Sequence, residues 1–93
     1  MSQITLDTVV RIHEDAVFRE LGGEGVLLQL ASGMYFGLDP VGTRLWQLLE
    51  QHGTLRTTAD AAAREFDAGA DVLERDLLEL VAELHEKQLV VLE

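Results

Sequence analysis

Residues 25–49 constrain the fold more than any other part of the chain, because they join two β-type runs directly to an amphipathic helix. The runs cover residues 26–30 and 34–38, and the sequence Ala-Ser-Gly between them is typical of a hairpin turn. The first run alternates loosely, whereas in the second the apolar side chains lie on one side and Tyr35 on the other. The pattern predicts a small antiparallel sheet.

A helix is predicted to begin directly after the second run. The Asp39 side chain can accept hydrogen bonds from free amides of the first helical turn, and the φ angle of Pro40 suits the first helical position. The helix is expected over residues 41–51, ended by Gly53. Its apolar stripe consists of Val41, Leu45, Trp46, Leu48 and Leu49. The whole segment holds no candidate catalytic residue, which favours binding over chemistry.

The first half of the chain is predicted to be β-rich. Residues 17–21 are typical of a strand, and the glycines of residues 22–25 suit a tight connection to the hairpin. Residues 8–13 are expected to form an N-terminal strand or an extended arm.

Two further helices are predicted in the second half. One would start after Thr57, with Asp60 completing a shortened capping box, and would end near Phe66. Its inner face would be Ala59, Ala62, Ala63 and Phe66. The other helix would have Asp71 as its N-cap, and its apolar stripe would be Leu73, Leu77, Leu80 and Leu84, widened by Leu78, Val81 and Ala82.

The short apolar segment at residues 88–92 could return as a strand. This order of elements predicts an α+β fold, in which a three-stranded antiparallel sheet packs on a three-helix, winged-helix-like bundle.

Length and composition indicate a single domain over residues 1–93. The hydrophobic fraction of 47% argues against disorder despite a formal charge of −10. Cysteine is absent, which excludes disulfides, a thiolate nucleophile and a Cys-ligated zinc site. The N-terminus lacks the features of a signal peptide, and no apolar stretch approaches the ~20 residues that span a bilayer. A cytoplasmic protein that does not bind membranes is therefore expected.

The charge distribution argues against nucleic acid as a partner. Acidic residues number 17 against 7 Lys and Arg, and the basic residues are scattered along the chain. DNA binding depends on clustered basic side chains. If the last two helices formed a helix-turn-helix, the segment 71–87 would enter the major groove with six acidic residues against Arg75 and Lys87. The acidic surface instead suits solubility, or a basic region of a partner.

No group of residues predicts catalysis, a metal site or a cofactor. The histidines lack the short spacing of metal ligands, and His13-Glu14-Asp15 is more typical of a solvent-facing polar segment. The acidic residues between positions 71 and 86 lack the calcium-loop pattern. Neither a Ser-His-Asp order nor a phosphate-binding loop is present. The chain is not expected to be an enzyme.

Three segments together resemble the PqqD-like family over residues 9–92: VLLQLASGMYFGLDPVGTRLWQLL, TADAAAREFD and LERDLLELVAELHEKQLV. The most specific positions are Gly33, Tyr35, Phe36, Leu38, Gly42 and Trp46, and further matches are Asp76, Leu77, Leu78, Val81, Leu84 and Leu89. The family usually has Gly before the final apolar pair, where this chain has Gln88. This difference affects the expected geometry of the turn after the third helix, but not the expected fold.

The PqqD-like family comprises leader-peptide recognition domains, or peptide chaperones, of pathways for ribosomally synthesised, post-translationally modified peptides. The resemblance implies a three-stranded sheet on three helices of winged-helix type. It also implies capture of a precursor's leader peptide as an added strand, and delivery of that peptide to a separate modifying enzyme. An unpaired edge at residues 34–38 would permit such β-augmentation.

The expected peptide site lies along this edge and is closed by the third helix. Gly33 and Gly37 would let another backbone approach, Tyr35 would lie at the rim, and Arg75 would pair with an acidic leader residue. For each leucine of the third helix, a place in the core is an equally good interpretation. The predicted peptide-binding residues are Gly33, Met34, Tyr35, Phe36, Gly37, Leu38, Leu73, Arg75, Leu77 and Leu80.

Two other classes of function stay open at this point. A winged-helix transcription regulator would retain DNA in a salt-dependent way, and a structural or assembly subunit would use the same edge to pair with another protein. A monomer or weak dimer is expected, because an unpaired edge strand can also pair with a second copy.

Overall fold

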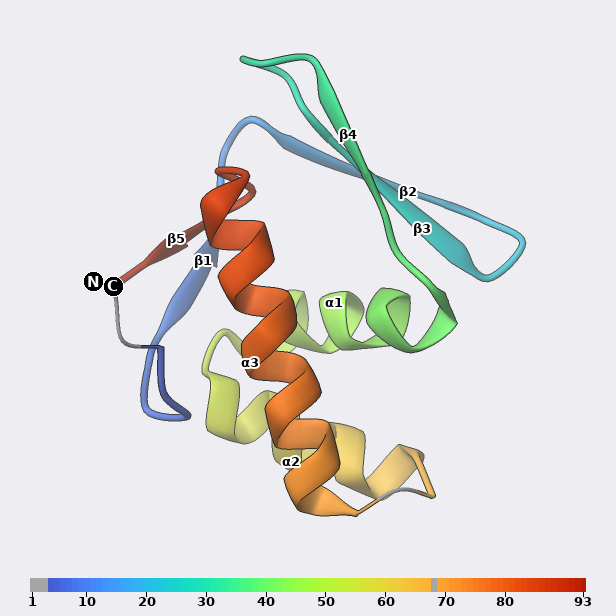
Figure 1. Ribbon diagram of the computed structural model, residues 1–93, viewed down its shortest axis with the longest axis vertical. Helices are drawn as coiled ribbons and strands as arrows, with labels where there is room; N and C mark the ends of the chain where they lie inside the picture. Colours follow the sequence, from blue (N-terminus) through green and yellow to red (C-terminus); the bar gives the residue numbers. More distant parts are fainter. Residues whose placement is uncertain (1–3, 68) are drawn as a thin grey trace.

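The computed structural model describes residues 4–67 and 69–93. Strands β2, β3 and β4 form a three-stranded antiparallel sheet with β3 in the middle, and β1 pairs with β5 in a separate two-stranded ribbon (Figure 1). The elements in chain order are β1 (Val10–Ile12), β2 (Ala16–Leu21), β3 (Glu24–Gln29), β4 (Met34–Gly37), α1 (Pro40–His52), α2 (Leu55–Glu65), α3 (Ala70–Glu86) and β5 (Val90–Leu92). The predicted α+β class, with a three-stranded antiparallel sheet and three helices, is confirmed.

The two hairpins of the sheet follow from their turn residues. Gly33 has a φ of 72°, which residues with a side chain rarely adopt, and its amide donates to the Gln29 carbonyl (2.8 Å). The β2–β3 turn is shorter than predicted, because Glu24 and Gly25 already belong to β3. Strands β3 and β4 pair in one continuous register, from Val26 opposite Gly37 to Gln29 opposite Met34.

Helix α1 has the ends predicted for it. The Asp39 carboxylate accepts a hydrogen bond from the Gly42 amide at 2.7 Å, and Pro40 is the first helical residue. At the other end, Gly53 has a φ of 79° and its amide donates to the Leu49 carbonyl. Asp39 and Pro40 therefore set the point at which the chain passes from β4 into α1.

The predicted start of α2 is wrong. The helix begins at Leu55 with Thr54 as its N-cap, and Thr57 lies inside its first turn. The reason is tertiary: the amides of Leu55 and Arg56 donate to the carbonyls of Thr8 and Leu6 at 3.4 and 2.9 Å. The N-terminal arm thus supplies acceptors that a capping side chain would otherwise provide.

The predicted N-cap of α3 is also wrong, since the helix begins at Ala70 after Gly69 and makes no side-chain cap. Asp71 lies in the first turn instead, where its negative charge still interacts favourably with the helix dipole.

The core lies between the sheet, α1 and the α2–α3 pair. Trp46 of α1 is 1% exposed and stacks on Phe18 of β2 with ring centroids 6.0 Å apart, as its place on the apolar stripe predicted. Leu27 of β3 is fully buried beneath the same helix. Ala59 and Ala62 face the core, whereas the other two predicted inner residues of α2 are only partly buried.

Among the helices of the described residues, none combines the length and the apolar character that crossing a bilayer requires.

Candidate functional site: an open strand edge facing a groove

Strand β4 forms one edge of the three-stranded sheet, because β3 is its only strand partner within the described residues. The opposite edge, β2, contains the charged residues Arg19 and Glu20, whereas the sequence of β4 is Met-Tyr-Phe-Gly. Charged side chains on an edge strand hinder pairing with another chain. Of the two edges, β4 is the one suited to accept an additional strand.

The main-chain groups of Tyr35 and Gly37 point to this open edge. The Leu38 amide donates to the Gly25 carbonyl at 2.8 Å, and the register continues from there along β4. In an antiparallel pair, alternate residues exchange hydrogen bonds with the neighbouring strand. The intervening residues Tyr35 and Gly37 therefore direct their N–H and C=O groups away from β3. A Cβ added to Gly37 would meet no atom within 4 Å, so this end of the edge is open.

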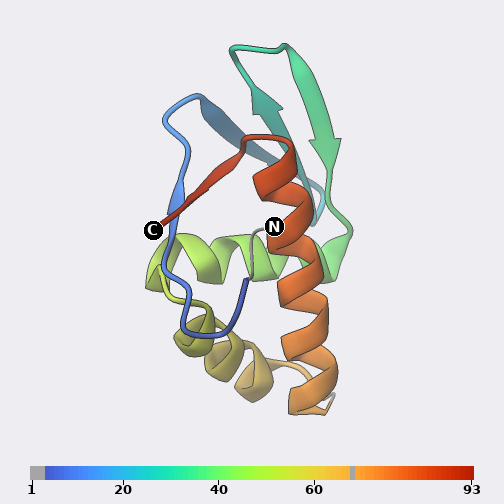
Figure 2. The same cartoon turned by 60° about the vertical axis from the view of Figure 1, so that its left-hand side comes forward.

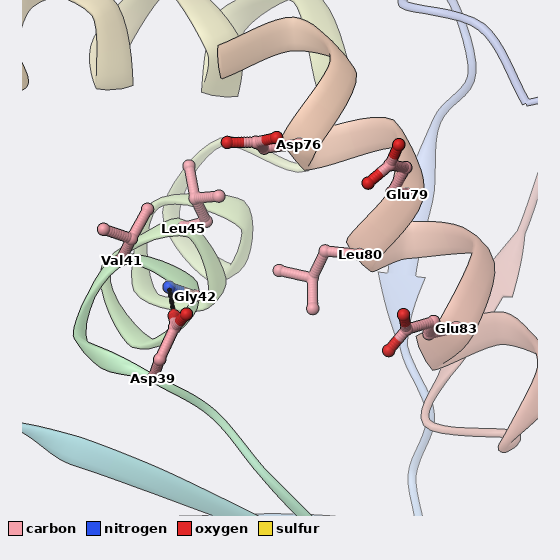
Figure 3. A pocket seen from close by; sticks show the side chains of 8 residues that line it. All are labelled: Asp39, Val41, Gly42, Leu45, Asp76, Glu79, Leu80 and Glu83. Carbon is pink, nitrogen blue, oxygen red and sulfur yellow. Dashed lines mark hydrogen bonds between the residues drawn. The ribbon is translucent and has the colours of Figure 1, made fainter. Parts of the chain in front are cut away.

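Helix α3 runs alongside the segment in which β4 leads into α1 (Figure 2). Two cavities lie along this side of α3, one against the start of α1 and one against the start of β4, and we call the pair the β4–α3 groove. The first, of about 370 Å³, is lined by Asp39, Val41, Gly42, Leu45, Asp76, Glu79, Leu80 and Glu83 (Figure 3). The second, of about 320 Å³, is lined by Ser32, Met34, Tyr35, Glu86, Lys87 and Gln88.

The two cavities lie near opposite ends of β4. At the second cavity, the Lys87 ammonium lies 5.4 Å from the centroid of the Phe36 ring, a cation–π contact between β4 and the end of α3. The start of β4 and the end of α3 thus line one cavity, whereas the start of α1 and the acidic face of α3 line the other.

Most of the predicted β4 residues are accessible. Met34 and Tyr35 are 66% and 70% exposed, and Gly33 and Gly37 are exposed as well. Phe36 is half-buried beside Lys87, and Leu38 belongs to the core at 6% exposure.

Two of the predicted α3 residues do not reach the surface. Leu73 and Leu77 are 3% and 0% exposed and belong to the core cluster, so their assignment to the peptide site is corrected. Leu73 and Leu77 are four positions apart and therefore share one face of α3. This face packs against α1 and α2. Leu80 lies beside this stripe and lines the first cavity, while Arg75 is exposed and lines neither cavity.

The sequence interpretation missed the acidic lining of the groove. Asp76, Glu79 and Glu83 are not among the predicted peptide-binding residues, yet all three line the first cavity. Their spacing of i, i+3 and i+7 places them on one face of α3. The spacing is sufficient to recognise this acidic face from the sequence. It does not reveal that the start of α1 lies opposite the face.

Gln29 is the other residue whose role only the structure reveals. Its side chain is 2% exposed; Nε2 donates to the Gln88 carbonyl at 2.6 Å, and Oε1 accepts from the Ala31 amide at 2.8 Å. It thereby ties the β3–β4 turn to the end of α3. Gln88 itself has a φ of 60°, so the turn keeps a left-handed residue at the position where the family usually has Gly.

Within residues 4–67 and 69–93, no group of three or more His, Asp or Glu side chains is arranged to hold a metal ion. The groove offers main-chain pairing, apolar contacts and negative charge. This combination suits recognition of an extended peptide.

The chain is similar to two solved structures that contain a leader peptide. A structure of TbiB1 in complex with the TbiA(beta) leader peptide is 38% identical to this chain, with a TM-score of 0.80, and the match covers 86% of this chain and 93% of that one. A structure of lasso peptide synthetase B1 complexed with the leader peptide shares the fold, with a TM-score of 0.78 at 23% identity over 88% of this chain and 96% of the other. No curated protein matches the chain. The sequence model of the family described as Coenzyme PQQ synthesis protein D (PqqD) matches residues 24–90, and the chain therefore belongs to this family.

Proposed function

We propose that this chain is a non-catalytic module that binds the leader of a precursor peptide and presents it to a separate maturation enzyme. The leader adds as a strand to β4, and α3 covers it from the other side. Holding the precursor in this way raises its local concentration at the enzyme's active site.

The observation that carries this proposal is the open edge of β4. Tyr35 and Gly37 offer main-chain groups at this edge, and β4 contains no charged residue that would hinder pairing. Tyr35 also lines a cavity that the end of α3 closes from the other side. Main-chain pairing gives affinity that tolerates different sequences, and neighbouring pockets give selectivity. The TbiB1 complex supports the same interpretation, because it shows a protein of this fold and of 38% identity with a leader peptide bound.

Titration of isotope-labelled protein with the TbiA(beta) leader peptide tests the placement. We expect the largest amide shift changes at residues 33–38, with further changes along the groove face of α3. A scrambled peptide of the same composition serves as the control. Changes confined to α2 and β5, with residues 33–38 unaffected, would contradict the placement on β4.

Duplex DNA is expected not to bind measurably at physiological salt. The groove face of α3 presents Asp76, Glu79 and Glu83, which repel phosphate. Fluorescence anisotropy with a labelled random duplex, repeated at low and physiological salt, measures this. Retention at physiological salt would favour a winged-helix regulator over a peptide-binding module.

A further inference from the structure

We propose that the first cavity of the groove accepts a Lys or Arg side chain of the bound peptide, so that the module selects leaders with a basic residue next to the Gly37 end of β4. The inference rests on the proposed function, because the peptide on β4 brings this side chain to the cavity.

The first argument is charge. Asp76, Glu79 and Glu83 line the cavity from α3, and none of the described residues that line it is basic (Figure 3). The ion pairs of the described residues involve other carboxylates, namely those of Glu93, Glu65 and Asp7. The three α3 carboxylates are therefore available to a cation from a partner.

The second argument is the shape and polarity of the cavity. Leu80 points from α3 towards the start of α1, where Val41 and Leu45 provide further apolar surface (Figure 3). Lys and Arg combine an alkyl stem with a charged tip, and they bury the stem along apolar surface while the charge stays at a polar rim. A carboxylate would be repelled here. A purely apolar side chain would remove water from the acidic groups without replacing its hydrogen bonds.

The third argument is position. Asp39 follows β4 by two residues and already accepts a hydrogen bond from the Gly42 amide, which fixes the wall of the cavity opposite α3. The cavity thus lies beyond Gly37, at the end of the open edge. The second cavity, at the other end of β4, is lined by Glu86 and Lys87, whose opposite charges offset each other. The two ends of the groove therefore differ in charge, and the acidic end is the one that requires a basic side chain.

The test uses a display library of random 12-residue peptides, selected on the wild-type protein and on the double variant Glu79→Gln/Glu83→Gln. The control variant Glu14→Gln/Glu74→Gln has the same change in net charge, and neither of its positions lines the groove. Amide shifts of labelled wild-type protein identify which selected peptides bind along β4.

Peptides that bind β4 of the wild type are expected to share a Lys or Arg at one position. Replacing it by Met should weaken binding to the wild type and the control variant by about three- to fivefold at low salt, and less at high salt. The same replacement should have no effect on binding to Glu79→Gln/Glu83→Gln. Equal losses with all three proteins, or peptides on β4 without a shared basic position, would overturn this inference and leave the proposed function standing. Failure to select any peptide that binds β4 would overturn both.

Discussion

Replacing Trp46 by Ala is expected to lower the free energy of unfolding by about 3–5 kcal/mol. The indole is 1% exposed and stacks on Phe18, so its removal leaves a cavity between α1 and the sheet that neighbouring side chains cannot close completely. Small domains are stable by only about 5–15 kcal/mol, so this loss is a large fraction of the total stability. Urea denaturation followed by circular dichroism gives the difference.

Two controls make this result specific. Trp46→Phe keeps an aromatic ring against Phe18 and should cost less. It also removes the indole Nε1, which is buried without a hydrogen-bond partner of good geometry among the described residues. Val41→Ala, on the same helix at 39% exposure, should change stability only slightly. An unchanged denaturation midpoint for Trp46→Ala would mean that α1 does not pack on the sheet through this face.

Replacing Tyr35 by Pro is expected to weaken leader binding by at least about tenfold while lowering stability much less. Proline has no N–H group, and its fixed φ of about −65° does not match an extended strand, so the main-chain pairing offered by the open edge is lost. The Tyr35 amide points away from β3, so no hydrogen bond of the existing sheet is removed. Binding of the TbiA(beta) leader by calorimetry, together with the melting temperature of each variant, separates the two effects.

The matched control places proline on the other edge of the same sheet. The Leu30 amide donates to the Asp15 carbonyl at 2.9 Å, and the register continues along β2, so the Glu20 amide also points to an open edge. Glu20→Pro should therefore cost comparable stability and leave leader binding intact. Tyr35→Phe should retain most of the binding because the amide remains. Equal loss of binding in Glu20→Pro and Tyr35→Pro would mean that the peptide does not use β4 specifically.

The sequence alone determined the features that depend on local chemistry. The β3–β4 hairpin follows from a turn that needs a positive φ at Gly33, and the start of α1 follows from Asp39 and Pro40. The apolar period of α1 determined that Trp46 is buried. Each of these outcomes depends on residues within a few positions of one another, which is why the order of the elements and the family could be recognised before the structure.

Only the tertiary structure decided which surfaces face one another. Helix α2 begins at Leu55, earlier than the sequence predicted, because carbonyls of the N-terminal arm, about 50 positions earlier in the chain, accept the amides of Leu55 and Arg56. Leu77 and Leu80 belong to the same apolar stripe in the sequence, yet Leu77 is buried in the core and Leu80 lines the groove. Which of them is buried depends on where α1 and β4 lie beside the helix. The acidic residues of α3 become part of a site for the same reason. A helical period specifies which residues share a face, but contacts between distant segments decide what that face meets.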